Sequence, residues 1–248
     1  MMSERIALVT GGNRGIGLQI ARDLAGQGLT VLIGSRDLAN GEAAARDIGG
    51  TARAIQLDVT DPASIAAAAD RIAQDFGRLD VLMNNAGISR AGNGLPFAEA
   101  VKRNLITDAP MEDIRAVYET NVFGVIAVTK AMLPLLKKSP AGRIVMTGSS
   151  GASLTLNSNP DNPHRRMFGN YSASKTAEHA VMLAFALALE DTNIKVNAAC
   201  PGFTSTALNN FNGTRSVEEG ARAPVRLALV GADGPTGTFS DENGPVPW

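Results

Sequence analysis

Short apolar runs rich in β-branched residues alternate along the chain with longer, alanine-rich segments of helical propensity. Continuously apolar strands are typical of parallel sheets that helices cover on both faces. The alternation therefore predicts an α/β fold, a single doubly wound domain with a seven-stranded parallel sheet and helices on both faces. The predicted strands are Ile6–Thr10, Thr30–Gly34, Ala54–Asp58, Val81–Asn84, Arg143–Thr147, Lys195–Ala199 and Thr236–Ser240. The predicted helices begin near Gly15, Asp37, Pro62, Met111, Ser172 and Ser216.

The length and composition narrow the class of protein. The 248 residues suit one large domain, and no linker or repeat divides residues 1–248. The 23 Lys and Arg against 24 Asp and Glu argue against a nucleic-acid partner. One cysteine, Cys200, and two histidines, His164 and His179, argue against disulfides, metal sites and histidine-driven hydrolysis. Neither a signal peptide nor a membrane span is expected, since the apolar stretch Ala180–Leu189 is too short. We expect a cytoplasmic protein with no membrane partner.

Three stretches interrupt the alternation after predicted strands. They are the substrate-side loops near residues 88–110, 150–170 and 203–223. Long loops in a compact domain are usually functional or disordered. Because open α/β sheets bind ligands at the carboxyl ends of their strands, these loops are expected to border the site.

A glycine-rich loop joins the first strand to the first helix. Its pattern is G-x-x-x-G-x-G, which differs from the commoner dinucleotide spacing. Leu18 and Gln19 replace the Lys-Ser/Thr that a nucleoside-triphosphate loop requires. Glycines let the backbone approach a phosphate, and the helix start offers free N–H groups to a pyrophosphate. A glycine-rich turn without a ligand has the same local pattern. The predicted contacts are Gly11, Asn13, Arg14, Gly15, Ile16 and Gly17.

The end of the second strand favours NADP(H) over NAD(H). Many NAD sites place an acidic side chain there to accept from the ribose hydroxyls. This chain has Ser35 and Arg36 instead, and Arg14 lies in the glycine loop. Two guanidinium groups can hydrogen-bond a 2′-phosphate that a carboxylate would repel. Solvated surface arginines are the simpler alternative.

Tyr171 and Lys175 lie one turn apart on a predicted helix. A phenol of pKa ~10 is a poor acid–base catalyst at neutral pH, and a nearby ammonium would lower that pKa. This spacing is also common on surface helices. The overlapping Ser172–Lys175 matches the S-x-x-K motif of penicillin-binding proteins, but the companion motifs of that class are absent.

Taken together, these motifs resemble the short-chain dehydrogenase/reductase family, over about residues 5–240. The matching segments, in the family's order, are Thr10–Gly17, Asn84–Gly87, Asn121, Ser149, Tyr171-x-x-x-Lys175 and Pro201–Gly202. The resemblance implies a Rossmann-like fold and a catalytic tetrad of Asn121, Ser149, Tyr171 and Lys175.

The resemblance also implies a role for each member of the tetrad. Tyr171 would donate a proton to a carbonyl oxygen, and Ser149 would hydrogen-bond that oxygen. Lys175 would lower the pKa of Tyr171 and hold the nicotinamide ribose. Asn121 would hold a water that passes protons towards Lys175. The choice of Ser149 over Ser150 depends on the alignment of Arg143–Val145. The further cofactor contacts that the resemblance implies are Asp58, Val59, Asn85, Ala86, Gly87, Pro201, Gly202, Thr204 and Thr206, besides Tyr171 and Lys175.

Ser149 and Tyr171 lie further apart than in most of the family. The extra residues, about Ser158–Phe168, resemble a longer insertion in the NADPH-dependent carbonyl reductase branch, where such insertions can block the helix pairing that builds tetramers. The choice between a homo-oligomer and a monomer stays open. An apolar substrate pocket is expected from Leu95, Phe97, Leu154, Leu156, Met167, Phe168, Phe203, Leu208 and Phe211, with His164 a further candidate.

These features predict NADPH-dependent reduction of a small-molecule ketone or aldehyde, with Tyr171 as general acid and no metal. An NAD(P)-dependent secondary-alcohol dehydrogenase and a 3-oxoacyl thioester reductase are the enzymatic alternatives. An NADP-sensing regulator that has kept the fold without turnover is the non-enzymatic one.

Overall fold

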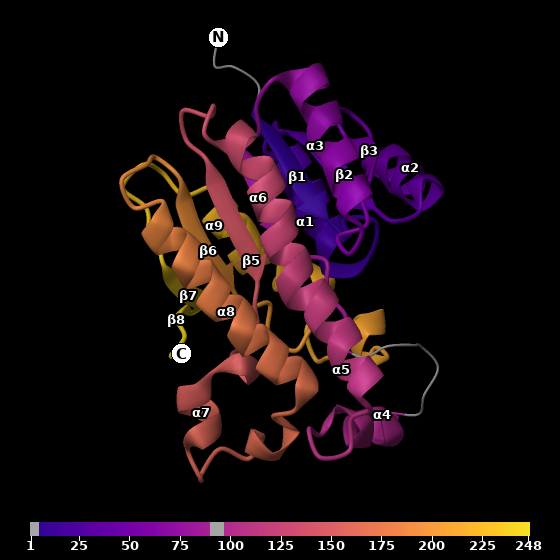
Figure 1. The fold of residues 1–248 in the computed structure, drawn as a ribbon, viewed down its shortest axis with the longest axis vertical. Coiled ribbons are helices and arrows are strands. Elements are labelled where there is room, and N and C mark those ends of the chain that lie inside the picture. Colours follow the sequence, from indigo (N-terminus) through magenta and orange to yellow (C-terminus); the bar gives the residue numbers. More distant parts are fainter. Residues whose placement is uncertain (1–4, 90–96) are drawn as a thin grey trace.

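A twisted sheet forms the centre of the protein in a computed structural model that describes residues 5–89 and 97–248 (Figure 1). Its strands are β1 (Ile6–Thr10), β2 (Thr30–Ser35), β3 (Arg53–Gln56), β4 (Val81–Asn84), β5 (Arg143–Thr147), β6 (Lys195–Ala199), β7 (Thr238–Asp241) and β8 (Gly244–Pro245). They are arranged in the order β3-β2-β1-β4-β5-β6-β7-β8. The predicted doubly wound fold is confirmed.

The predicted strand count of seven is wrong by one. The seven expected strands pair in parallel, and β8 pairs antiparallel with β7 through Ser240 with Pro245 and Asp241 with Gly244. A two-residue strand has no periodicity of its own, so its pairing depends on the neighbouring edge. The bounds of β3 also differ, because Asp58 lies beyond the end of that strand.

The helices are α1 (Gly15–Gly26), α2 (Leu38–Ile48), α3 (Pro62–Phe76), α4 (Phe97–Asn104), α5 (Met111–Tyr118), α6 (Gly124–Leu136), α7 (Leu154–Ser158), α8 (Asn170–Ala188) and α9 (Val217–Ala228). Short π- and 3₁₀-helical segments are η1 (Glu119–Phe123), η2 (Ser150–Ala152), η3 (Arg165–Met167) and η4 (Ala207–Asn209). All six predicted helix starts correspond to helices. The helices α4 and α7 lie inside stretches that the sequence marked only as loops.

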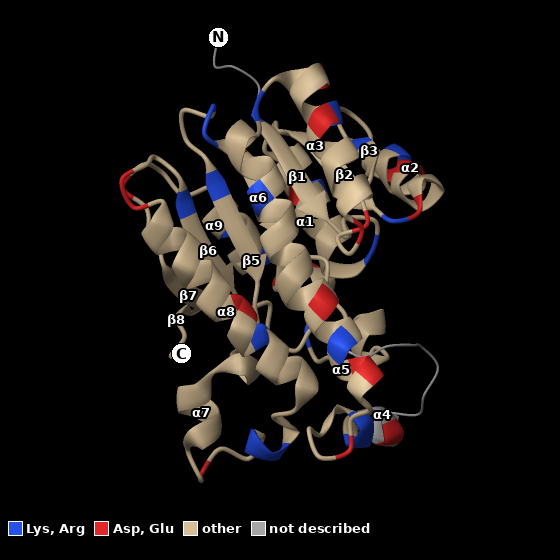
Figure 2. Cartoon of the chain, in the orientation of Figure 1, with Lys and Arg blue, Asp and Glu red and all other residues tan. Residues whose placement is uncertain are grey.

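Helices cover the sheet on both faces (Figure 1). Ala7 and Val9 of β1 pack into a cluster with α1 and α9, whereas Ile6 and Leu8 pack into a second cluster with α3, α6 and α8. Both faces of the strand are therefore buried, which is why it is apolar throughout rather than alternating. In Figure 2 acidic and basic residues are interspersed over the face drawn.

Local signals begin the helices. Asp61 accepts a hydrogen bond from Ala63 N–H at 2.9 Å, and Pro62 occupies the first position of α3, as the Asp-Pro pair predicts. Ser216 and Glu219 form a reciprocal capping box at the start of α9.

The continuous helical run Met111–Leu136 comprises α5, η1 and α6. It is long and apolar enough to cross a membrane by length and composition alone, and half of its most apolar window is buried inside the protein. A buried core helix has the same properties. Residues of α6 pack in the same hydrophobic cluster as residues of β4 and β5.

Asp80 connects segments at the amino-terminal ends of the central strands β1 and β4. Its carboxylate, 2% exposed, accepts from Ile6 N–H at 2.8 Å and from the Ser139 hydroxyl at 2.5 Å, and it pairs with Arg78 at 3.1 Å. We expect Asp80→Ala to lower the free energy of unfolding by about 3 kcal/mol, because buried donors lose a charged acceptor.

Urea denaturation measures this loss. Asp75→Ala is the matched control, since Asp75 forms an i,i+4 pair with the largely exposed Arg71 and its loss is expected to cost less than about 0.5 kcal/mol. Equal losses in the two variants would contradict the assignment of Asp80 as a structural centre.

Candidate active site

One large cavity opens at the carboxyl ends of the parallel strands. Its volume is about 1760 Å³ and its wall runs from the glycine loop, past the end of β4, to α8 and the segments around α7 and η4. The chain passes from β3 at one edge to β4 beside β1, which is the switch point where doubly wound folds bind ligands. All predicted cofactor contacts line this cavity: Gly11, Asn13, Arg14, Gly15, Ile16, Gly17, Ser35, Arg36, Asp58, Val59, Asn85, Ala86, Gly87, Tyr171, Lys175, Pro201, Gly202, Thr204 and Thr206.

The glycine loop is shaped for close approach of a ligand. Gly11 and Gly15 have positive φ angles of 61° and 55°, which disfavour other residues. A Cβ at Gly17 would collide with the Gly11 carbonyl and the Asn85 amide. Arg14 precedes α1 without capping it through its side chain, so the first N–H groups of the helix have no side-chain cap. This cradle fits a pyrophosphate.

Thr10 ties the glycine loop to the end of β4. Its hydroxyl accepts from the N–H groups of Asn85 and Ala86, both at 2.9 Å, and donates to the Met83 carbonyl at 3.2 Å. The Asn85 amide in turn donates to the Thr10 carbonyl at 3.0 Å. The segment Asn84–Gly87 therefore fixes the loop geometry as well as lining the cavity.

Two guanidinium groups line the cavity beside the glycine loop and the end of β2. Arg14 and Arg36 are exposed, and neither forms an ion pair with any other residue in the described parts of the chain. Asp37, which the sequence indicated only as a helix start, also lines the cavity. Its carboxylate is engaged as the cap of α2, accepting from Ala39 N–H at 2.9 Å and the Asn40 amide at 2.9 Å. The Asp37 carboxylate is therefore bonded to the first turn of α2.

Tyr171 lies in the first turn of α8 and lines the cavity. Burial raises the pKa of its phenol, the Lys175 ammonium lowers it, and Glu178 and Cys200 raise it; the net direction is upward. The expected lowering by Lys175 is present, but burial outweighs it. Without a cofactor the phenol stays protonated, which suits a proton donor.

Two contacts hold the side chain of Lys175, one turn after Tyr171 on α8. Its ammonium donates to the Thr147 carbonyl at 2.9 Å and forms an ion pair with Glu178 at 2.8 Å. Burial lowers the pKa of Lys175. The Glu178 carboxylate and Tyr171 raise it by more than burial lowers it, so the net direction is upward. The ammonium lies beside Gly87, where a Cβ would come within 3.5 Å of it.

Asn121 lies behind the cavity rather than on its wall. It is fully buried in η1, a π-helical segment of the kind that often marks functional sites. Its amide oxygen accepts from Ile88 N–H at 2.9 Å, and its nitrogen donates to the Ile88 carbonyl at 2.8 Å and the Ser174 hydroxyl at 3.0 Å. These bonds fasten the segment after β4 to α8, and the predicted water-holding role stays a prediction.

Ser149 and Ser150 both line the cavity after β5. The Ser149 hydroxyl accepts from Gly151 N–H at 3.2 Å, and its backbone N–H donates to Nε2 of His179 at 3.4 Å. Ser150 donates its backbone N–H to the Cys200 sulfur at 3.1 Å. The assignment of Ser149 as the catalytic serine stays a prediction.

Three residues that contact the site were not identified from the sequence. Asn104, at the end of α4, accepts from Tyr171 N–H at 2.9 Å and so caps α8 from 67 positions away. His179 is buried with its ring 4.1 Å from that of Phe239, and burial lowers its pKa to about 4, so it is neutral. Glu178 is the buried partner of Lys175. Only Glu178 and His179 had a sequence signal, as the last polar residues of α8 before its apolar second half.

Part of the cavity wall, here called the apolar wall, consists of apolar residues that the sequence predicted for a substrate pocket. The expected residues that line it are Leu156, Met167, Phe168, Phe203, Leu208 and Phe211, together with His164. Leu154 does not line the cavity. Leu95 and the side chain of Phe97 lie outside the described residues.

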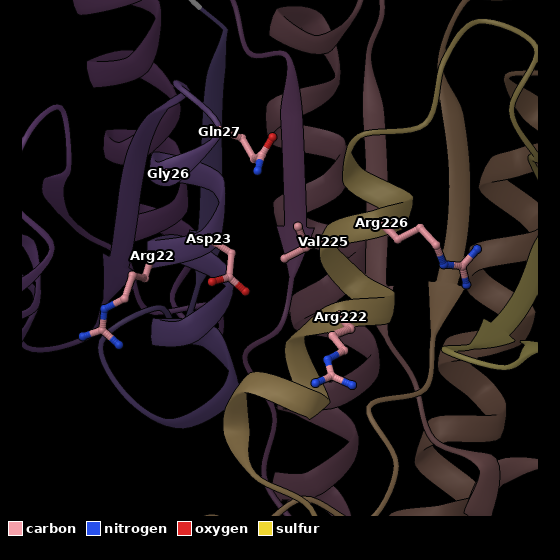
Figure 3. A pocket seen from close by; sticks show the side chains of 7 residues that line it. All are labelled: Arg22, Asp23, Gly26, Gln27, Arg222, Val225 and Arg226. Carbon is pink, nitrogen blue, oxygen red and sulfur yellow. The ribbon is translucent and has the colours of Figure 1, made fainter.

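A second, smaller hollow lies between α1 and α9, away from the tetrad (Figure 3). Its volume is about 520 Å³, and Arg22, Asp23, Arg222 and Arg226 are on its wall. Arg22 pairs with Asp47, Arg222 with Glu242, and Arg226 donates to the Asp241 carbonyl. These charges are engaged with the protein itself.

Known proteins are similar to this chain over most of its length. A family model described as short chain dehydrogenase matches residues 5–216. The short-chain dehydrogenase/reductase ATR10 of Stachybotrys chlorohalonatus is 38% identical over 264 residues, covering 98% of this chain and 90% of the relative. Carbonyl reductase (NADPH) 1 of Rattus norvegicus is 32% identical over 292 residues, covering all of both chains.

A solved structure is similar over nearly the same extent. The salutaridine reductase of Papaver somniferum has a TM-score of 0.79 and 29% identity, and the match covers 95% of this chain and 99% of that one. Because the family model and these relatives span most of the sequence, this chain belongs to the short-chain dehydrogenase family of oxidoreductases.

Proposed function

We propose that this protein reduces a ketone or aldehyde to an alcohol with NADPH, and that Tyr171 is the general acid. The observation that carries the proposal is the single cavity in which the glycine loop, Tyr171 and an apolar wall meet. A dinucleotide, a proton donor and a carbonyl compound need to be held within reach of one another, and one continuous cavity provides this.

The residues beside the glycine loop and the end of β2 support NADPH. Arg14 and Arg36 have no acidic partner among the described residues, and the neighbouring Asp37 is engaged as a helix cap. A 2′-phosphate would give both guanidinium groups a charge-assisted partner. The rat relative is named as an NADPH enzyme, which supports the same cofactor.

The chemistry assigned to the chain is proton transfer and charge stabilisation. NADPH supplies the hydride that forms the new C–H bond. Tyr171 donates its phenolic proton to the carbonyl oxygen, and the Ser149 hydroxyl donates a hydrogen bond to that oxygen as negative charge develops. Lys175 stabilises the phenolate left on Tyr171 until the proton is replaced. Asn121 holds α8 against the cofactor segment.

The apolar wall favours a substrate of small to medium size with an apolar body. Its aromatic and aliphatic side chains leave few charged groups opposite Tyr171, so a ketone or aldehyde fits better than a charged keto acid. We extend the proposal to a cytoplasmic enzyme without nucleic-acid or membrane partners.

An NADPH-consumption screen tests the function. We expect turnover with at least one class among α-ketoesters, aryl ketones, cyclic enones and quinones, with less or none when NADH replaces NADPH. Tight NADPH binding without turnover across the panel would contradict the enzyme and favour an NADP-sensing regulator.

A further inference from the structure

Glu178 is a buried carboxylate that the tetrad does not include. It lies on α8 three residues after Lys175, is fully buried, and its Oε2 is 2.8 Å from the Lys175 ammonium. Apart from this ion pair, neither carboxylate oxygen has a hydrogen-bond partner within residues 5–89 and 97–248.

The ion pair of Lys175 and Glu178 is buried, which is unusual for charged residues on a helix. A buried carboxylate needs excellent pairing to compensate for its lost hydration, and apolar replacements of buried ion pairs are often as stable or more stable. On the same face, the residues that follow Glu178, Met182 and Ala186, are apolar, whereas those one turn before it, Ser174 and Lys175, are polar. Helix stability alone is therefore a weak reason for a carboxylate here, and its contact with a catalytic lysine points to the reaction.

The charge of Glu178 acts on proton transfer. An ammonium beside a phenol favours the phenolate, which accepts protons, whereas reduction needs the phenol, which donates one. A carboxylate at 2.8 Å offsets the charge of Lys175 and so keeps the proton on the couple. We propose that Glu178 is a positioning residue that holds the Tyr171–Lys175 couple in its proton-donating form. The inference rests on the proposed reductase function.

The other ionisable groups around this couple are few. Burial raises the pKa of the Glu178 carboxyl to about 7, although the charge of Lys175 and its hydrogen bond lower it. Cys200, at the end of β6, acts on Tyr171. His179, on the same helix, is neutral because burial lowers its pKa. From β5 the contact is an uncharged carbonyl, that of Thr147.

The direction of the pH effect follows from these charges. Above pH 7 Glu178 is ionised and raises the affinity of the couple for its proton; below pH 7 this effect fades as the carboxyl is protonated. Without the carboxylate, the couple loses a proton at lower pH, whichever of its two groups releases it. In a plot of kcat/KM for reduction against pH, the fall on the alkaline side (the alkaline limb) then moves to lower pH.

The pH dependence of kcat/KM with NADPH in Glu178→Gln and Glu178→Asp separates charge from shape. We expect the Gln variant to move the alkaline limb down by about one pH unit or more, and the Asp variant to stay near the wild type. A role in packing alone predicts the opposite order, because Gln keeps the shape and Asp does not. Glu190→Gln, at an exposed position just after α8, is the matched control and is expected to change nothing.

A second measurement needs neither substrate nor turnover. The chain has only two tyrosines, Tyr118 and Tyr171, so the tyrosinate absorption of Tyr171 can be isolated by difference against Tyr171→Phe. We compare the wild type with Glu178→Gln, in which Lys175 stays in place. A second pair, Lys175→Met and Lys175→Met/Glu178→Gln, serves if Glu178→Gln does not fold, because the double variant has no unpaired buried charge. Loss of the carboxylate is expected to lower the pKa of Tyr171.

The two measurements distinguish the inference from the proposed function. If no carbonyl compound is reduced but the Tyr171 titration moves as expected, the function fails and the electrostatic role of Glu178 stands. If reduction occurs and neither the alkaline limb nor the titration moves, the inference is overturned and the function stands.

Discussion

Tyr171→Phe is expected to lower kcat for carbonyl reduction by about 10²–10⁴-fold while NADPH still binds. The substitution removes one hydroxyl from the cavity wall and leaves the ring that forms part of it. Without the phenolic hydroxyl, no group at this position can protonate the developing alkoxide. The glycine loop, Arg14 and Arg36 are unchanged, so NADPH binding is expected to persist. Steady-state rates and fluorescence titration of NADPH measure the two effects separately.

The other tyrosine provides the control. Tyr118 ends α5 and does not line the cavity, so Tyr118→Phe is expected to keep the wild-type rate. Undiminished reduction by the Tyr171→Phe enzyme would mean that the proton comes from elsewhere. A large loss of NADPH affinity in that variant would show instead that the hydroxyl mainly supports the cofactor.

The second large effect is expected in cofactor choice. Arg14→Ala/Arg36→Ala should weaken NADPH binding by about 10²-fold or more, because charge-assisted hydrogen bonds contribute roughly 1.5–3 kcal/mol each. NADH has no 2′-phosphate, so its affinity should change little. Titration of both cofactors against both proteins gives the ratio directly.

Arg46 offers a matched control for the loss of charge. It lies on the exposed side of α2, pairs weakly with Glu42 and does not line the cavity. Arg46→Ala should leave both affinities unchanged. Tighter binding of NADH than of NADPH by the wild type would refute the assignment of the two arginines.

The central part of the fold could be predicted because its signals are local. A strand buried on both faces has to be apolar throughout, as β1 is, and the Asp61-Pro62 pair satisfies the first turn of α3 wherever that helix packs. The glycine loop is of the same kind, since positive φ at Gly11 and Gly15 is a property of the turn itself.

The substrate side could not be predicted in the same way. At the start of the short helix α7, Thr155 N–H donates to the carbonyl of Trp248 at 2.6 Å, which is distant in sequence. Asn104 likewise caps α8 from another segment. Such contacts have no sequence period, so the stretches around α4 and α7 could be recognised only as interruptions.

The doubly wound sheet, the glycine loop and the helix that carries Tyr171 and Lys175 could be read from the sequence, because each depends on burial pattern or backbone geometry within a few residues. The eighth strand, the engagement of Asn121 by Ile88 and Ser174, and the upward pKa shift of Tyr171 arise from the tertiary structure. These depend on which groups lie within a few ångströms across the fold. Burial, which has the largest effect on the pKa of Tyr171, is set by that surrounding volume, whereas the charges of Lys175 and Glu178 come from α8 itself.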